Sequence, residues 1–597
     1  MAKQVTTPPA IATTLHRHGT ESPTQRLDRL LYASTAPLTN GLSPVSLSLA
    51  WADWAWHLAV SPGRQMELAA LGTQLAADTL QHAVSNGGAD DTQLAGSTDD
   101  DPRFRHPAWA TWPYSVLRSG FRNSEAFWRE AAHMPGMTAH HAEMTQFFAR
   151  QALGMMAPAN WLATNPVAQQ DAAASGGTHL AKGALNWLAD VSGVPDAEAI
   201  VNAARIEVGR NVAITPGKVV FRNRLVELIR YTPQTTTVRP EPLLIVPSWI
   251  MKYYILDLQP HNSMVNYLVG QGHTVYIVSW LNPDAADREL TMDDYLRLGI
   301  FDTLRAVGGL HGAAQPLHAM GYCLGGTLLA IAAAALGRSG GIADSAGLPP
   351  LKSLTLLAAQ TDFSKPGELG LFIDESQIGY LDSITQGKGY LSGKQMAGSF
   401  QFLHSRDLVW TRRMREYLMG EREQATDLMA WNADTTRMPA RMHHEYLTAL
   451  YLHNALATSS YRVEGRAGSL ADIRMPVFLV GTERDHISPW RSVHKLHPLC
   501  DAEITFVLAS GGHNAGIVSE PGHANRSYRI DQRPAQGPWV EHEQWLRQAA
   551  QHEGSWWPAW HAWLAARSSR PHKAQPIPAA AVLGDAPGEY VRQRYDD

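Results

Sequence analysis

Short apolar runs alternate with longer helical stretches over the second half of the chain. Six such runs lie at 242–249, 273–280, 316–322, 351–359, 475–481 and 502–510. Apolar runs of this length predict buried β-strands, and their separation by helices predicts a parallel sheet covered on both faces. Residues 219–233 precede these runs and predict a β-hairpin that turns at Asn223.

The first part of the chain has a helical pattern instead. Residues 45–84 predict two amphipathic helices that are interrupted at Ser61-Pro62-Gly63, and a polar linker follows over 85–101. Residues 102–205 are helical in pattern and rich in aromatic side chains. We predict a Thr/Pro-rich disordered tail, a mainly helical N-terminal domain and an α/β domain, over residues 1–25, 26–205 and 206–597.

One long segment breaks the strand–helix rhythm of the α/β domain. Residues 364–470 read as helical, are rich in Tyr, Trp, Met and Leu, and lie between two late strands. Insertions at such places carry function in many folds because the scaffold beneath them is rigid. We therefore predict that this segment is a cap over an active site.

Composition and charge argue against several classes of function. The 597 residues carry a net charge of −5 with scattered Lys and Arg, which gives no electrostatic basis for binding nucleic acid. No apolar run approaches the ~18 residues of a membrane span, and the N-terminus has no apolar core of a secretory signal. Only two cysteines occur. They could pair, but they do not make a disulfide framework, which suits a reducing cytoplasm.

A tight turn flanked by glycines joins one strand to a small-residue helix. It reads GYCLG over residues 321–325, which matches the G-x-S-x-G turn of serine hydrolases with Cys323 in place of Ser. In this motif a strained turn holds the nucleophile, and small neighbours let the backbone close. The amide of Leu324 is expected to stabilise an oxyanion, together with a second amide at Trp249 or Ile250.

An aspartate and a histidine later in the chain complete a catalytic triad in the order nucleophile, acid, histidine. Asp485 follows one strand, and His513 lies in a Gly-rich loop after the next strand. Carboxyl ends of parallel strands meet at one edge of a sheet, so both side chains are expected near Cys323. An Asp after a strand is often only a helix N-cap, and the prediction therefore depends on all three residues together. We predict this triad on an α/β-hydrolase fold.

Other reactive side chains are given smaller roles. Cys500 is expected to be a small packing residue, and His486 either supports the site or faces solvent. His443 and His444 are neighbours in a predicted helix, where adjacent side chains point away from each other. We therefore predict no metal site.

Several blocks of the sequence resemble the polyhydroxyalkanoate synthases over most of the chain. They include LAWADWAWHLAVSPGRQMELA, DPRFRHPAW, PLLIVPSWIMKYYILDLQP, GYCLGGTLLA, TDFSKPGELGLFI, WNADTTRMPARMHHEYL and VGTERDHISP. The resemblance puts the family's catalytic Cys, Asp and His on Cys323, Asp485 and His513. Chain length and the N-terminal block look most like class I enzymes, whereas Tyr322 and Leu324 differ from the Phe and Val expected there.

The resemblance implies an acyltransferase that polymerises (R)-3-hydroxyacyl-CoA into a polyester through an acyl–Cys323 intermediate. Coenzyme A would be part of the substrate and would leave, and no separate cofactor is implied. The resemblance also implies a homodimer at the surface of polymer granules in the cytoplasm. A thiol suits this chemistry because an acyl group moved from CoA to Cys323 remains an activated thioester, whereas Ser would form an oxygen ester close in energy to the polymer.

Two alternatives remain open from the sequence. A cysteine-dependent thioesterase or hydrolase on the same fold would share the triad and release free acid. A non-catalytic granule-binding protein would not need the triad at all, so the three residues argue against it.

Overall fold

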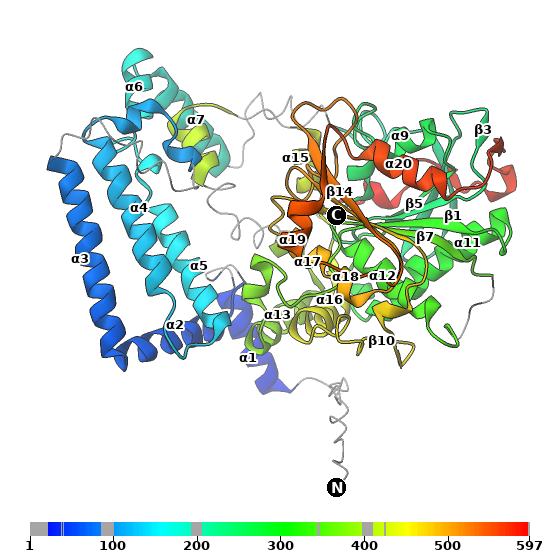
Figure 1. Cartoon of the computed structure of the whole chain (residues 1–597), viewed down its shortest axis with the longest axis horizontal. Coiled ribbons are helices and arrows are strands. Elements are labelled where there is room, and N and C mark those ends of the chain that lie inside the picture. The colour runs from blue at the N-terminus through cyan, green and yellow to red at the C-terminus, as the bar shows by residue number, and fades with distance from the viewer. Residues whose placement is uncertain are drawn as a thin grey trace, which may run out of the picture.

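The computed structural model describes residues 22–36, 39, 41–84, 101–192, 206–342, 345, 347–393, 395–396, 410–422 and 426–594. Within these residues the chain forms a group of N-terminal helices beside a large sheet that carries helices on both faces (Figure 1). Residues 1–21 of the predicted tail lie outside the described residues, and the first helix begins at Pro23. The predicted linker lies outside them up to residue 100.

One sheet organises the α/β domain, and eleven of its strands fall within the described residues. Their order along the sheet is β15 (Ala550–Glu553), β14 (Ser527–Arg533), β13 (Ile504–Ala509), β12 (Val477–Thr482), β7 (Leu351–Leu357), β6 (Leu317–Tyr322), β4 (Leu243–Val246), β5 (Val275–Trp280), β2 (Val226–Tyr231), β1 (Gly217–Arg222) and β17 (Gly584–Asp585). Strands β13 to β5 are parallel, and antiparallel strands flank them on both sides.

The strand predictions are confirmed. Each of the six apolar runs contains one of the parallel strands, and β1 and β2 form the predicted antiparallel hairpin. The parallel strands are buried along nearly their whole length. Helices cover both of their faces, which explains why these runs are continuously apolar rather than alternating.

Two helices show how the faces of the sheet are covered (Figure 1). In α12 (Leu324–Gly337) every residue from Leu324 to Ala335 is buried. On the other face, α20 (Trp557–Ala566) uses its indoles: Trp560 Nε1 donates to Thr355 Oγ1 at 3.0 Å, and Trp563 Nε1 donates to Thr505 Oγ1 at 3.1 Å. The tryptophan-rich C-terminal segment therefore belongs to the core.

The N-terminal domain is helical, as predicted. Its helices are α1 (Pro23–Thr35), α2 (Pro44–Ala59), α3 (Pro62–Val84), α4 (Tyr114–Ala131), α5 (Ala139–Met155), α6 (Pro166–Ala174) and α7 (Thr178–Ser192). Small apolar clusters hold them together, and Trp54 Nε1 donates to the Ala131 carbonyl at 2.7 Å. No described helix is both long enough and apolar enough to cross a lipid bilayer.

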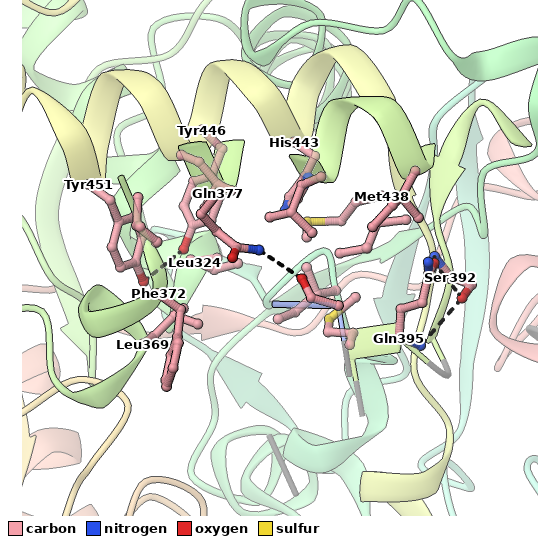
Figure 2. A pocket seen from close by; sticks show the side chains of 18 of the residues that line it. Leu324, Leu369, Phe372, Gln377, Ser392, Gln395, Met438, His443, Tyr446 and Tyr451 are labelled. Atoms are coloured by element: carbon pink, nitrogen blue, oxygen red, sulfur yellow. Dashed lines mark hydrogen bonds between the residues drawn. The ribbon is translucent and has the colours of Figure 1, made fainter. Parts of the chain in front are cut away.

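The segment predicted to be a cap is a largely helical insertion between β7 and β12. Its elements include η8 (Glu368–Phe372), α13 (Glu375–Lys388), β8 (Tyr390–Leu391), η10 (Met414–Leu418), α15 (Asp427–Ala433), β9 (Met438–Pro439), α16 (Ala440–Tyr446) and η11 (Leu447–Leu452). The short β8–β9 pair was not predicted. Side chains of α13 and α16, among them Gln377, His443 and Tyr446, point into a cavity (Figure 2).

The N-terminal helices contact this cap at several places. Helix α1 packs against α13, where Tyr32 and Tyr380 meet edge to face. Arg150 of α5 forms an ion pair with Glu368. Asp190 of α7 pairs with Arg422 at 2.9 Å. The N-terminal domain is thus attached to the insertion that covers the cavity.

Candidate active site

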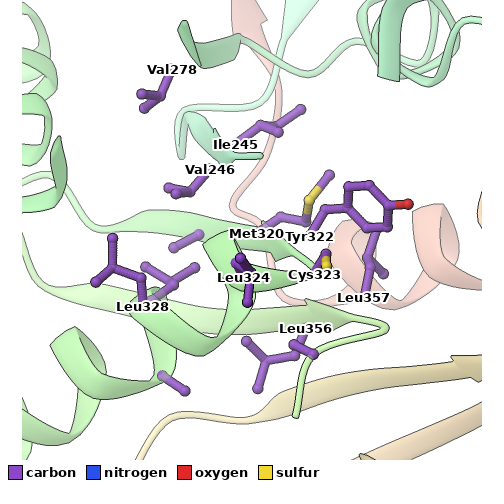
Figure 3. Packing of buried hydrophobic residues seen from close by; sticks show 14 of the residues in the cluster. Ile245, Val246, Val278, Met320, Tyr322, Cys323, Leu324, Leu328, Leu356 and Leu357 are labelled. Atoms are coloured by element: carbon purple, nitrogen blue, oxygen red, sulfur yellow. The ribbon is translucent and has the colours of Figure 1, made fainter. Parts of the chain in front are cut away.

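Cys323 lies in the turn between β6 and α12, as the motif predicts. Its φ is +53° and its ψ is −125°, a backbone conformation that is uncommon for a residue with a side chain and that clusters at functional sites. The Cys323 amide donates to the Leu357 carbonyl at 2.8 Å, and its own carbonyl accepts from Gly326 at 2.9 Å. Apolar side chains of the neighbouring strands surround it (Figure 3).

The glycines on either side of Cys323 are required by close backbone contacts. A Cβ added at Gly321 would lie 2.4 Å from Gly326 Cα. A Cβ added at Gly325 would lie 2.3 Å from the carbonyl oxygens of both Val246 and Pro247. Real Cβ atoms do not approach other atoms this closely, so both positions exclude any larger residue unless the backbone moves.

Asp485 and His513 meet at the carboxyl ends of adjacent strands. Asp485 comes three residues after β12, and His513 comes four residues after β13. His513 Nδ1 lies 2.7 Å from Asp485 Oδ2. The same carboxylate accepts from Thr482 Oγ1 at 3.0 Å and from the amides of Ile487 and Ser488 at 2.9 and 2.7 Å. These bonds fix the carboxylate, so it holds the imidazole in one orientation.

The structure brings the three predicted residues together. Burial of the His513 ring favours its neutral form. The charges of Asp485 and Cys323 and hydrogen bonds to both outweigh that effect, and they raise the pKa of His513 well above its usual value. The ring therefore lies between the carboxylate and the thiol and is poised to carry a proton. Their catalytic roles stay predictions.

The sequence analysis missed a tyrosine–asparagine pair beside the triad. The Tyr322 hydroxyl donates to Asn514 Oδ1 at 2.6 Å, and the Tyr322 ring lies 5.7 Å from the His513 ring at an interplanar angle of 31°. Burial raises the pKa of Tyr322 well above its usual value, so the hydroxyl stays protonated and can donate. Sequence position alone could have indicated this pair, because Tyr322 directly precedes Cys323 and Asn514 directly follows His513.

The predicted oxyanion amides lie on two segments beside Cys323. Leu324 is the first residue of α12, where backbone amides have no partner within the helix. The other segment, residues 249–251, is called the oxyanion loop here. Its Ile250 lines the same cavity as Cys323 and Leu324. The Trp249 side chain is buried against Tyr295 and Tyr446, so the prediction for this residue concerns its backbone amide alone. Both amide assignments stay predictions.

The cap supports the oxyanion loop directly. Thr436 Oγ1 donates to the Trp249 carbonyl at 2.5 Å, and the Thr436 amide donates to the Ile250 carbonyl at 3.0 Å. Trp431 Nε1 donates to the Lys252 carbonyl at 2.7 Å, immediately after the loop. The conformation of the oxyanion loop therefore depends on the cap as well as on the sheet.

Comparison with known proteins agrees with this geometry. Family models match residues 22–64 and 100–268 as two N-terminal regions of poly-beta-hydroxybutyrate polymerase, and residues 241–520 as an alpha/beta hydrolase fold. The poly(3-hydroxyalkanoate) polymerase of Methylorubrum extorquens is 37% identical over 504 residues, covering 83% of this chain and 81% of that protein. The PhaC subunit of the polymerase of Cupriavidus necator is 36% identical over 505 residues, covering 83% of each chain. The chain belongs to the poly(3-hydroxyalkanoate) polymerase family.

Membership of this family confirms the resemblance seen in the sequence. It also confirms the α/β-hydrolase fold and the prediction that the chain is an acyltransferase. In this polymerase-family protein the nucleophile position of the fold is occupied by Cys323, which lines a cavity together with residues of the cap.

The cavity that contains Cys323 has a volume of ≈ 560 Å³ and a mostly apolar wall. Tyr446 and Tyr451 stand on the same side as Leu324, and their hydroxyls are 3.1 Å apart (Figure 2). Met438, Ser392 and Gln395 lie on the opposite side. The cavity thus extends away from the nucleophile and offers room for a substituent on a reacting acyl group.

One histidine of the cap also lines this cavity. Burial lowers the pKa of His443 to about 4, so the ring is neutral near pH 7. Its neighbour His444 faces elsewhere and bonds Asp382 Oδ2 at 2.8 Å. Among the described residues there is no cluster of three metal-ligating side chains.

The remaining predicted residues lie outside the triad. Cys500 is buried and free, with its Sγ 3.8 Å from the Ile473 carbonyl, which confirms its packing role. The His486 side chain is exposed. Cys323 is also unpaired, so the two cysteines do not form a disulfide.

Proposed function

We propose that this protein polymerises (R)-3-hydroxyacyl-CoA thioesters into a polyester and releases CoA through an acyl–Cys323 intermediate. The observation that carries the proposal is a thiol at the nucleophile turn, with His513 beside it and an apolar, cap-covered cavity above it. The family's named activity is consistent with each part of this arrangement.

In the first half of the cycle, His513 accepts the Cys323 proton as the sulfur attacks the thioester carbonyl. The amides of Leu324 and of the oxyanion loop stabilise the oxyanion. The carbon–sulfur bond to CoA then breaks, and His513 returns the proton to the departing CoA thiolate. Asp485 holds the imidazole and stabilises its charged form.

In the second half, the 3-hydroxyl of another acyl group gives its proton to His513 as its oxygen attacks the acyl–Cys323 carbonyl. The carbon–sulfur bond breaks, an ester bond forms, and Cys323 regains the proton. Water would hydrolyse the same thioester, so the site has to exclude it. The apolar wall of the cavity serves this purpose.

The surface of the N-terminal domain supports an association with polymer granules. Large apolar side chains of α2 are exposed, including Trp56 at 71% and Leu49 at 51%. A hydrophobic polymer surface would cover them. We place the enzyme on granules in the cytoplasm as a homodimer, with no nucleic acid partner.

The deciding experiment mixes purified protein with (R)-3-hydroxybutyryl-CoA and follows both free CoA and the acyl product. The proposal expects CoA release together with insoluble polyester. Release of CoA with only free 3-hydroxybutyrate would identify a thioesterase instead. Cys323→Ala should stop CoA release, and polymer formed by that variant would refute the acyl–Cys323 intermediate. With Cys323→Ser, any acyl–enzyme formed should be an oxygen ester that accumulates without chain growth.

A further inference from the structure

Part of the cavity wall comes from the start of the chain, about 280 residues before the nucleophile. Ala33 near the end of α1, Ala36 directly after it, and Gly41 and Leu42 just before α2 line the cavity that contains Cys323. Figure 1 shows α1 against the cap helix α13, far from the other N-terminal helices α3 and α4. The N-terminal domain therefore contributes to the cavity itself.

A single side chain holds the backbone on both sides of Leu42. Gln377 of α13 is 3% exposed, and its Nε2 donates to the Gly41 carbonyl at 2.8 Å. Its Oε1 accepts from the Ser43 amide at 2.7 Å. Figure 2 shows Gln377 in the middle of the cavity side chains. Because one amide group satisfies a carbonyl and an N–H two residues apart, it fixes the position of the residue between them.

A partly buried carboxylate strengthens this attachment. Asp374 Oδ1 accepts from the Gln377 amide at 2.8 Å, which caps α13, and from Ser46 Oγ at 2.8 Å. The first turn of α2 and the first turn of α13 are thus tied to the same group. At the end of α1, on the other side of Leu42, Thr35 Oγ1 lies 3.0 Å from the Tyr380 hydroxyl. The segment around Leu42 is anchored from both directions.

Leu42 belongs to the apolar wall of the cavity. It packs into a cluster with Leu369 and Phe372 of η8, and both of these residues also line the cavity. Phe147 of α5 supports Phe372 from behind, with ring centroids 5.2 Å apart. The wall at Leu42 is therefore backed by packed aromatic rings and cannot recede easily.

We propose that Leu42, held in place by Gln377, limits the length of the acyl side chain that the cavity accepts. This inference rests on the proposed function, because it assigns a specificity-determining residue to the same site. A substrate methylene that fits or fails to fit an apolar pocket changes the specificity constant by about 10- to 200-fold. Replacing Leu42 by Ala removes three carbon atoms from the wall and makes space for a longer substituent.

The test compares kcat/KM for (R)-3-hydroxyoctanoyl-CoA and (R)-3-hydroxybutyryl-CoA. Leu42→Ala should raise the ratio of long to short substrate by at least about 10-fold, and Leu42→Phe should lower it. Gln377→Ala should also raise the ratio, because Leu42 loses both of its backbone anchors. Leu80→Ala is the matched control, since Leu80 is 66% exposed on α3 and does not line the cavity.

A binding readout separates this inference from the proposed function. Unreactive thioether analogues of both substrates are titrated into each variant by calorimetry, so that the ratio of their dissociation constants is measured without turnover. Ratios unchanged in folded Leu42→Ala and Leu42→Phe would overturn the role of Leu42, whatever the enzyme's product. A shifted ratio without polymer formation would retain Leu42 as a wall residue and reject the polymerase assignment. Circular dichroism confirms that each variant is folded.

Discussion

The substitution Gly325→Ala tests whether the nucleophile turn must lie in close contact with Val246 and Pro247, at the end of β4. The added Cβ would lie 2.3 Å from the carbonyl oxygens of Val246 and Pro247, whereas ordinary contact begins at 3.4 Å. Helix α12 and the strand end must therefore separate by about 1.1 Å, the difference between these two distances. The segments that move carry Cys323, the Leu324 amide and the residues leading into the oxyanion loop.

A displacement of this size is expected to slow acylation strongly. Misplacing catalytic groups by about 1 Å costs up to about 100-fold in rate, and overpacking a buried site costs about 1–3 kcal/mol of stability. We expect single-turnover acylation of Cys323 to fall about 100-fold, with a lower Tm. Rapid quenching followed by mass spectrometry of the acylated protein measures the rate directly.

The matched control is Gly309→Ala in α11 (Asp302–His311). The Cβ added there has no atom within 4 Å. Alanine also has the higher helix propensity, so this variant should acylate normally and melt at the same or a slightly higher temperature. The reasoning is refuted if Gly325→Ala is folded and acylates within about threefold of the wild-type rate, because the close contact would then have no bearing on the chemistry.

Three further predictions concern the surroundings of the triad. Tyr322→Phe leaves the partly buried Asn514 oxygen without its 2.6 Å donor and should cost about 0.5–1.5 kcal/mol in urea unfolding; an unchanged free energy of unfolding would show that this bond contributes nothing. Asp485→Asn should weaken a pH dependence of stability. The raised pKa of His513 stabilises the fold fully below the unfolded value near 6.5, and this contribution is lost as pH rises through the folded pKa. Urea unfolding from pH 6 upward should show a shallower decline in the variant than in the wild type, because Asp485 is the largest cause that raises this pKa; equal slopes would contradict the assignment. Thr436→Val removes the hydroxyl that holds the oxyanion loop, and should slow acylation about 10-fold or more and also lower the Tm, because the buried Trp249 carbonyl loses its donor; a wild-type rate would mean that the sheet alone positions the loop.

The sheet and the triad could be predicted because each depends on a local pattern. Continuous apolar runs identify strands that are buried on both faces. The turn around Cys323 requires glycines, and those glycines are visible in the sequence. Asp485 and His513 were found from their positions after two successive strands, and parallel pairing places such positions at one edge of the sheet.

The wall of the cavity could not be predicted because it depends on contacts between distant segments. Gln377 is one polar residue in a helix, and the sequence carries no sign that it bonds the backbone around Leu42, more than 330 positions earlier. Thr436 is equally ordinary in sequence, yet it holds the oxyanion loop. Side-chain to backbone bonds of this kind follow from tertiary packing and leave no periodic pattern.

The attachment of α1 to α13 also has a consequence for how the chain is synthesised. Helix α1 begins at residue 23 and its partner helix begins at residue 375, so 352 residues separate them. At about 5–20 residues per second on the ribosome, the first helix emerges about 20–70 s before α13 exists. Throughout that interval Tyr32 and Leu42 lack their partners in the finished fold, and a chaperone that covers them would favour correct assembly.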